Sequence, residues 1–466
     1  MKAISRRQSK TAVAVGVGDA NAGVTVRDIF RNRNFRLLWT GEGISLIGDQ
    51  LYLIALPWLV LQLTGSAFAM GTVLALAAIP RALFMLLGGA LTDRFSPRIL
   101  MLGSNLGRLT LVATLAAVTL GGVVQLWMLY TFALLFGLAD AFFFPAQSAI
   151  VPKLIGSDRL QTGNAIIQGT AQLSMFVGPA LAGALIGVLD GGGAASVPDT
   201  RGIGVAFALD AASFLASVTA LSLMRLDRRQ AAPEAAAKEQ ALLSSIIEGL
   251  SAMWKDRILR YYFLLIGAVN FLITGPFSVG IPVLAHTRYS GGAAAFGIIL
   301  STYGAGSLAG VLLAGSTQRP SARKFPALML GLTAFMGVSL VLLGVMSALA
   351  PAAIVATMMG LAQGYVVIQF VTWLQMRTPA RMLGRTMSLL MFAVVGLAPV
   401  STTVAGALIQ VSATAVLMGA GVLMVLVVAV GSFSPSVWRL GFETEQKGQR
   451  LSGADSIVDE PVRQAA

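Results

Sequence analysis

Six ionisable side chains interrupt the apolar stretches in the first half of this chain: Glu42, Asp49, Arg81, Arg108, Asp140 and Asp210. Charge is unfavourable in an apolar environment unless it is paired or functional, so each of these groups needs a physical reason. Carboxylates and guanidiniums in such surroundings offer ion pairing and the binding and release of protons. The apolar stretches of the second half contain no comparable group and offer only the amides of Asn270, Gln363 and Gln369.

Glu42 and Asp49 are seven residues apart, which is close to two helical turns, so they lie on one face of a helix. The two residues are then about 10 Å apart along the helix axis. We expect a proton-coupling group made of Asp49, Glu42, Arg81 and Arg108. Burial and a neighbouring cation act on a carboxyl pKa in opposite directions, which allows proton exchange near physiological pH. The alternative, an ion pair of Asp49 with Arg81 or Arg108 that only fixes the packing, stays open.

The composition is far from that of a soluble protein. Of the 466 residues, 56% are hydrophobic and 11% are charged. The apolar residues fall in repeated runs of about 20, the length that a bilayer-spanning helix needs. With no cysteine and one histidine, disulfides are excluded and a His-based metal site is not expected. We expect no metal and no cofactor, and no phosphate-binding loop of the ATPase type is present.

Twelve apolar runs predict an all-α membrane protein with two sets of six membrane-spanning helices. The first set, within 35–225, is expected near 35–63, 68–91, 99–121, 125–150, 162–190 and 203–225. The second set, within 258–435, is expected near 258–285, 292–316, 323–348, 352–376, 382–410 and 412–434. The remaining segments are expected to be a cytoplasmic arm at 1–34, a cytoplasmic linker at 226–257 with an amphipathic helix at 242–254, and a cytoplasmic tail at 436–466.

The basic residues lie mainly on one side of the expected membrane. All but four of the 33 Lys and Arg residues lie in the termini or in the loops on the side of the termini; the exceptions are Arg81, Arg108, Arg201 and Arg288. Because cytoplasmic loops are enriched in Lys and Arg, we expect a multi-pass protein of a bacterial inner membrane with both termini in the cytoplasm. The net charge of +13 is spread over alternate loops, which argues against a nucleic-acid partner.

The two halves resemble each other at a fixed offset. Residues 220 or 221 positions apart are Gly89 and Gly310, Gly163 and Gly384, Asp49 and Asn270, and Pro179 and Pro399. These pairs fall in corresponding helices of the two sets. The pattern favours duplication of a six-helix unit.

A short polar turn joins the second and third expected spans. From Gly88 to Arg98 it reads Gly-Gly-Ala-Leu-Thr-Asp-Arg-Phe-Ser-Pro-Arg. The carboxylate of Asp93 lies beside the guanidinium of Arg94, and such a group can pair locally or reach the positive end of a neighbouring helix. An ordinary turn with stop charges is the alternative.

This turn resembles the G-x-L-A-D-R-x-G-R-K loop signature of the major facilitator superfamily, through Gly89, Leu91, Asp93, Arg94 and Arg98. The resemblance implies the major facilitator fold, in which two six-helix pseudo-repeats bind substrate at midplane between them. It also implies a gate, made of Gly89, Asp93, Arg94, Arg98 and Arg385. In this gate, Asp93 contacts the start of the eleventh span and holds the cytoplasmic side shut.

Two further resemblances narrow the function. The stretch with Gly178, Pro179 and Gly183 is similar to the G-P-x-x-G-G signature of antiporters in the superfamily, with a plain proline kink as the alternative. Residues 137–146, with 48–49, 248–250 and 383–385, resemble the branch that contains macrolide, multidrug and enterobactin exporters. The resemblance implies a secondary active exporter of amphiphilic drug-like or macrolide-like molecules, driven by proton antiport through alternating access. Export of a siderophore is the alternative.

Polar residues of the apolar runs are also candidates for contact with a substrate. Asn270, Asp140 and Gln363 are expected in the substrate cavity. Asp140 and Asp210 lie nearer the ends of their expected helices, where capping or local pairing is an equal alternative. The expected partners are a small-molecule substrate, protons and the lipid bilayer, with the chain acting as a monomer. A membrane enzyme acting on lipid and a non-transporting receptor are less favoured, because no loop is large enough for a catalytic domain and no His or Cys cluster is present.

Overall fold

The computed structural model describes residues 26–155, 159–189, 200–225, 257–317, 320–321, 324–378, 387, 390 and 393–433. Within these residues the regular structure is helical, without a strand. Eleven of the described helices are long and apolar enough to cross a membrane, and a shorter apolar helix covers Ala393–Ile409. The expected all-α membrane fold of two six-helix sets is confirmed.

The helices follow the expected order. The first half contains α1 (Val26–Phe30), α2 (Arg33–Thr64), α3 (Ala67–Arg94), α4 (Pro97–Leu120), α5 (Leu126–Ile155), α6 (Leu160–Leu189) and α7 (Arg201–Leu223). The second half contains α10 (Arg257–Thr287), α11 (Gly292–Ser316), α12 (Lys324–Val345), α13 (Leu349–Arg377), α15 (Ala398–Ile409) and α16 (Ala413–Ser432). The expected amphipathic helix at 242–254 and the tail at 436–466 lie outside the described residues.

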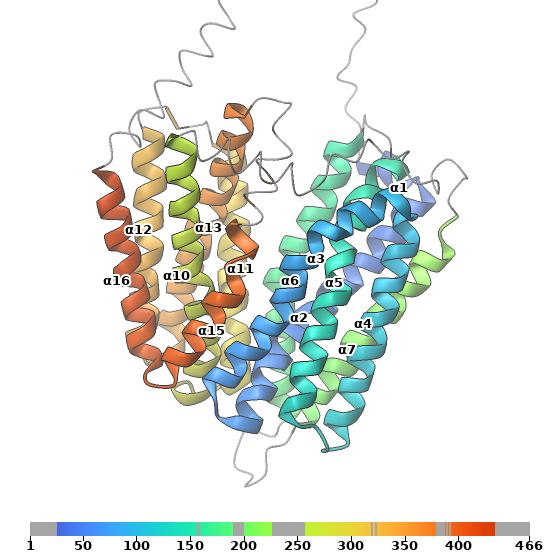
Figure 1. Cartoon of the computed structure of the whole chain (residues 1–466), viewed down its shortest axis with the longest axis horizontal. Coiled ribbons are helices and arrows are strands. Elements are labelled where there is room, and N and C mark those ends of the chain that lie inside the picture. Colours follow the sequence, from blue (N-terminus) through green and yellow to red (C-terminus); the bar gives the residue numbers. More distant parts are fainter. Residues whose placement is uncertain are drawn as a thin grey trace, which may run out of the picture.

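The two halves form two bundles that meet at one end and diverge toward the other (Figure 1). We call the end with α1 and the turn between α3 and α4 the terminal side. The end with the loops after Thr64 and Leu189 is the opposite side. Contacts between the bundles are made mainly by α6 with α11 and by α3 with α15. These are the fifth span with the eighth and the second with the eleventh, as two repeats related by symmetry would place them.

The bundles touch through glycines on the opposite side. A Cβ atom placed at Gly297 of α11 would lie 3.0 Å from the Cα atom of Gly183 in α6. A Cβ atom at Gly406 of α15 would lie 3.1 Å from the Cα atom of Gly71 in α3. Apolar side chains gain little by leaving lipid, so close approach of backbones at small residues is a main source of helix association in membranes. The glycines therefore allow backbone contact between the two bundles.

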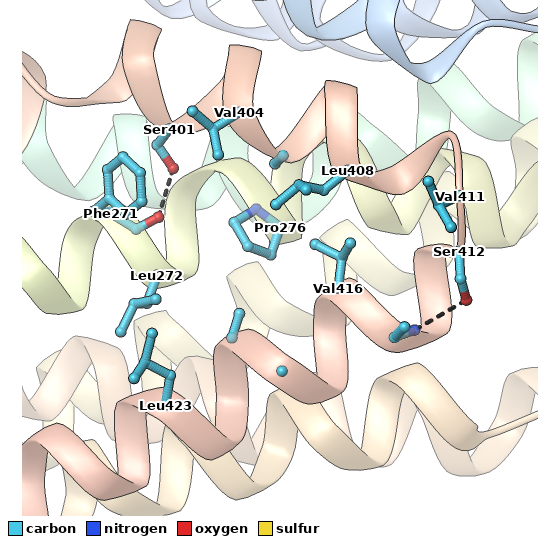
Figure 2. A pocket seen from close by; sticks show the side chains of 14 residues that line it. Phe271, Leu272, Pro276, Ser401, Val404, Leu408, Val411, Ser412, Val416 and Leu423 are labelled. Carbon is cyan, nitrogen blue, oxygen red and sulfur yellow. Dashed lines mark hydrogen bonds between the residues drawn. The ribbon is translucent and has the colours of Figure 1, made fainter.

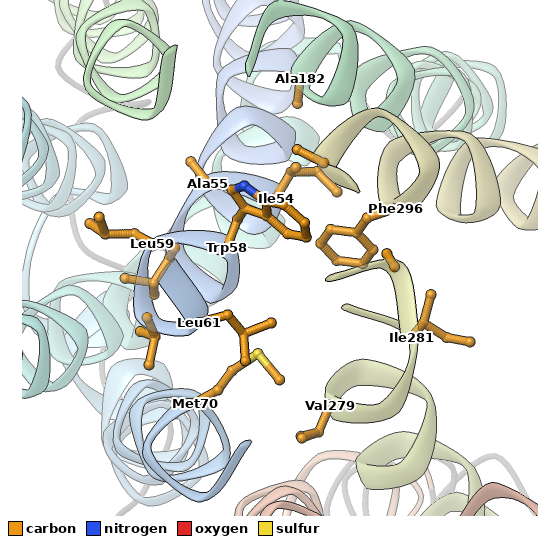
Figure 3. Close-up of a cluster of buried hydrophobic side chains, with 14 of the residues drawn as sticks. Ile54, Ala55, Trp58, Leu59, Leu61, Met70, Ala182, Val279, Ile281 and Phe296 are labelled. Atoms are coloured by element: carbon orange, nitrogen blue, oxygen red, sulfur yellow. The ribbon is translucent and has the colours of Figure 1, made fainter. Parts of the chain in front are cut away.

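An apolar cluster surrounds these glycine contacts. Figure 3 shows Trp58 of α2 and Phe296 of α11 facing one another from the two bundles. The ring of Trp58 also meets the ring of His286 in α10, with 5.4 Å between centroids. At the edge of the contact, Gln410 Nε2 donates a hydrogen bond of 2.9 Å to Ser66 Oγ. The opposite side is thus closed by packing between the two bundles.

Each bundle is also tied together within itself at its helix ends. In the first half, Arg98 donates from Nε and Nη2 to two carbonyl oxygens at the end of α7, at 2.7 Å in both cases. In the second half, Arg288 donates from Nη1 to the carbonyl oxygen of Gly344 at 2.7 Å and from Nη2 to Thr414 Oγ1 at 2.6 Å. A guanidinium at a helix C-terminus satisfies carbonyls that have no partner within the helix. Arg288 in this way joins the ends of α10, α12 and α16.

We predict that Gly297→Val opens the opposite side, because its side chain would meet backbone atoms of α6 that cannot rotate away. The chain has no cysteine, so spin labels on cysteines introduced at the exposed residues Val123 and Val411 report the separation of the bundles. The distance distribution should move to longer values. Gly419→Val, at an open position in α16, is the matched control. An unchanged distance in Gly297→Val would show that this contact does not hold the bundles together.

Candidate functional site

The charged groups of the first bundle converge on Asp140 of α5. Arg81 Nε of α3 lies 3.2 Å from Asp140 Oδ2, and Arg108 Nη2 of α4 lies 3.3 Å from Asp140 Oδ1. Each carboxylate oxygen therefore faces one guanidinium. The sequence placed Asp140 nearer a helix end, but α5 continues to Ile155, so Asp140 lies in the middle of its helix. The geometry makes Asp140 the centre of an ion-pair network across three helices.

Asp49 of α2 is a weaker partner in this network. Its Oδ1 lies 3.9 Å from Arg108 Nη1, farther than the two contacts of Asp140. The Asp49 side chain is 32% exposed, whereas that of Arg108 is only 3% exposed. Of the two carboxyl groups that contact Arg108, Asp49 is thus the one that a solvent proton or a bound molecule can reach.

Aromatic rings enclose the guanidinium of Arg108. Its Cζ lies 4.3 Å from the ring centroid of Phe143, 5.2 Å from that of Phe214 and 5.9 Å from that of Phe136. A cation over an aromatic face is attracted by the ring quadrupole, more strongly where water is excluded. The sequence alone did not indicate that these phenylalanines surround a cation. The spacing of Asp140 and Phe143, three residues apart on one helix, is a signal that could have placed them around the same cation.

Glu42 lies toward the terminal side of α2 and is held by neutral donors. It accepts a hydrogen bond of 3.1 Å from Ser217 Oγ and one of 3.3 Å from Gln147 Nε2. The side chain of Asn105 donates in turn to Ser217 Oγ at 2.8 Å. A crevice of about 10 Å³ lies beside Glu42 and is bordered by Gln147 and Thr170. That volume is about the space of one water molecule.

The second bundle contributes amides and apolar surface. Asn270 Nδ2 donates to the Ile266 carbonyl oxygen of its own helix at 3.1 Å, and Gln369 Nε2 donates to the Ala314 carbonyl oxygen at 3.5 Å. Gln363 is half-buried in α13. Within the residues that the structure describes, none of the acids and bases of the second half lies near these amides in the middle of a span. Among the described residues, the charged side chains in the middle of the spans therefore belong to the first bundle.

An apolar pocket of about 490 Å³ lies between α10, α15 and α16. Figure 2 shows its wall, with Phe271 and Pro276 on α10 and Leu408 on α15, and with Ser401 Oγ donating to the carbonyl oxygen of Phe271. No residue of the lining is charged. Leu408 and Val411 are exposed, so the pocket opens at the surface of the second bundle and is separate from the charged network.

The gate residues are only partly described. Gly89, Asp93 and Arg94 lie in the last two turns of α3, but their side chains and the whole of Arg385 lie outside what the structure describes. The expected contact of Asp93 with the eleventh span stays a prediction. Arg98, the remaining gate residue, donates hydrogen bonds to the carbonyl oxygens of Leu221 and Ser222 at the end of α7 in its own bundle.

The antiporter-like stretch forms part of the contact between the bundles. Gly178 and Pro179 lie inside α6, which continues as a helix through the proline. A Cβ atom at Gly178 would overlap the side chain of Gln50 in α2, and Gly183 lies against Gly297 of α11. The stretch therefore packs α6 against α2 within its own bundle and against α11 of the other bundle.

The profile of the Major Facilitator Superfamily matches residues 38–403. The chain belongs to the Major Facilitator Superfamily. It is therefore a multi-pass membrane transporter with small-molecule substrates, and not an enzyme.

Three similar proteins illustrate the relationship. The chain is 24% identical to macrolide efflux protein A of Streptococcus pyogenes over 286 residues, 60% of this chain and 66% of that protein. It is 26% identical to the multidrug efflux pump Tap of Mycolicibacterium fortuitum over 396 residues, 82% of this chain and 91% of that protein. The structure of a bacterial homologue of the lysosomal transporter Spinster matches with a TM-score of 0.63 at 14% identity, over 90% of this chain and 98% of that chain. The last comparison shows the fold alone.

The ion-pair network predicts a large effect of Asp140→Asn on stability. The substitution keeps the shape of the side chain but leaves Arg108, which is buried, with only the longer contact to Asp49. Breaking a buried ion pair typically costs about 3–5 kcal/mol. We expect a clear fall in the melting temperature of the purified protein in detergent or lipid.

The double variant Asp140→Asn with Arg108→Gln is the control for this prediction. Removing both charges leaves no buried guanidinium to compensate, so part of the lost stability should return. A melting temperature of Asp140→Asn equal to that of the parent protein would mean that Asp140 does not hold the network.

Proposed function

We propose that this transporter exports amphiphilic drug-like molecules in exchange for protons, through alternating access at a bacterial inner membrane. The observation that carries the proposal is the partly exposed Asp49 carboxyl beside the buried guanidinium of Arg108. Macrolide efflux protein A and the pump Tap, the relatives described above, support the substrate class. One chain contains both bundles and both halves of the cavity, so the proposed transporter works as a monomer.

Proton binding at Asp49 would change the charge of the site. An ionised Asp49 attracts Arg108 and presents a negative charge to a bound molecule. A proton on Asp49 removes that charge, weakens the attraction to Arg108 and reduces the affinity for a cationic substrate. Substrate and proton then compete for one cavity, which is the requirement of antiport. Glu42, two turns closer to the terminal side, is the proposed relay toward the cytoplasm.

The conformation fits the loading step of this cycle. The positive-inside distribution supports a cytoplasmic terminal side. The bundles are closed on the opposite side and diverge toward the terminal side (Figure 1). In the proposed cycle this state takes up substrate from the cytoplasm, and the glycine contacts of α6 and α3 separate when the transporter turns outward.

Asp49→Asn should abolish uphill transport, because an amide at this position cannot take up a proton. Purified protein in liposomes is given a pH gradient, with erythromycin and ethidium as probes of a macrolide and a lipophilic cation. The parent protein should concentrate at least one probe, and Asp49→Asn should only equilibrate it. Asp28→Asn, in α1 outside the spans, is the matched control. Equal accumulation by Asp49→Asn and the parent protein would place the coupling elsewhere.

A growth test decides the substrate class. A strain without the protein should lose tolerance to macrolides or to lipophilic cations. Normal tolerance combined with retention of the cell's own iron chelator would favour siderophore export instead.

The gate predicts a conformational effect of Asp93→Asn. If Asp93 holds the cytoplasmic side shut by contact with the eleventh span, the amide should favour the inward-open state and reduce efflux without loss of folded protein. Spin labels at the exposed residues Ser148 and Thr317 report the separation on the terminal side. The population at short distance should decrease in Asp93→Asn and remain in Asp28→Asn. The gate proposal fails if the two distributions coincide.

A further inference from the structure

Asp210 is a fully buried carboxyl group that the network of Asp140 leaves out. It lies in the middle of α7, and its exposed fraction is 0%. No described Lys, Arg or His forms an ion pair with it, and its Oδ2 atom is buried without a hydrogen-bond partner. An ionised carboxylate in this environment would have no ion-pair partner among the described residues and no donor at Oδ2. The Asp210 site therefore favours a neutral carboxylic acid.

The hydrogen bonds of Ser213 support the same conclusion. Ser213 Oγ lies 2.7 Å from the backbone carbonyl oxygen of Asp210 and 3.3 Å from Asp210 Oδ1. A serine hydroxyl has one hydrogen to donate, and the shorter contact to the carbonyl uses it. The contact with Oδ1 is then favourable when the carboxyl group supplies the hydrogen. Glu42 differs, because it accepts hydrogen bonds from two side chains.

The charges around Asp210 also favour a bound proton. Asp49 of α2 and Arg108 of α4 are the charged groups near Asp210, and the buried hydroxyl of Tyr52 in α2 lies near Asp210, Asp49 and Asp140. Glu42 lies two turns farther along α2, against Ser217. Helix α6, which also packs against α7, has no acid or base between Leu160 and Leu189. Four carboxyl groups thus share the two guanidiniums of Arg81 and Arg108, and both guanidiniums contact Asp140. Ionisation of all four would leave uncompensated negative charge inside the span.

Asp210 lies directly behind Asp49. A Cβ atom at Gly48 would lie 2.6 Å from Asp210 Oδ1, so the carboxyl group packs against the backbone of α2 at the residue before Asp49. Asp49 is partly exposed and Asp210 is not. Of the two acids on α2, Asp49 is the partly exposed one, which makes it the candidate for proton exchange with Asp210.

We propose that Asp210 is a second proton-binding site, neutral in this conformation, that exchanges its proton through Asp49. The O–H bond of Asp210 breaks, its electron pair stays on the new Asp210 carboxylate, and the Asp49 carboxylate takes up the proton. The proposal rests on the proposed antiport for its role in transport. It implies that one turnover exchanges two protons, one from each carboxyl group.

Infrared spectroscopy tests the bound proton without any substrate. The purified protein in lipid at neutral pH should show the carbonyl band of a buried carboxylic acid, and Asp210→Asn should remove it. Ser213→Ala should move the same band to higher frequency, because the acid loses its hydrogen-bond acceptor. Asp28→Asn should change neither intensity nor position. An acid band that is intact in Asp210→Asn and unshifted in Ser213→Ala would overturn the proposal.

Proton counting separates this inference from the proposed function. With ethidium in liposomes, the number of protons exchanged per ethidium should fall from two to one in Asp210→Asn, while uphill transport persists. A ratio that is the same as in the parent protein would overturn the role of Asp210 in coupling. If the parent protein itself moves neither ethidium nor erythromycin, the proposed function fails, and the infrared band still decides whether Asp210 holds a proton.

Discussion

The pairing of Asp140 with two arginines is the interaction on which the arrangement of the first bundle depends. A guanidinium at mid-depth in a bilayer needs an acceptor, and Asp140 offers one oxygen to each. This requirement fixes how α3, α4 and α5 are rotated about their axes. The aromatic rings of Phe143 and Phe214 pack against the guanidinium of Arg108. Asp49 lies farther from Arg108 than Asp140 does, and its side chain is partly exposed.

The two bundles divide the chemistry between them. The first provides charge and a set of carboxyl groups with different surroundings, from Asp140, which contacts two arginines, to Asp210, which forms no ion pair with a described residue. The described part of the second provides amides and apolar surface, including the pocket between α10, α15 and α16. The charged network and the apolar pocket therefore lie in different bundles, so the described residues of the two halves differ in what they can bind.

The spans and the family could be predicted from the sequence, because a bilayer imposes length and apolarity on every helix. The six ionisable groups could also be found, since charge in an apolar run is conspicuous. The pair of Asp49 with Arg108 was among the alternatives that the sequence offered, but the pairing of both arginines with Asp140 was not, because it depends on the rotation of each helix, which composition does not encode. Asp140 illustrates this: the sequence analysis placed it nearer a helix end, whereas it lies in the middle of α5 and contacts arginines from two other helices. The hydrogen bonds of Arg98 to the end of α7 could not be predicted either, because they join two helix ends that are distant in sequence. The surroundings of Asp210 are visible only in the structure, since they depend on which groups do not contact it.

The glycine contacts between the bundles have an energetic consequence. Within the described residues they bring backbone against backbone, with one side-chain hydrogen bond at the edge and no ion pair between the halves. Arg98 and Arg288 meanwhile keep each half internally fixed. Separation of the two bundles would break this contact and one hydrogen bond and would leave the hydrogen bonds of Arg98 and Arg288 in place, so a change in the angle between the bundles requires no rearrangement within either of them.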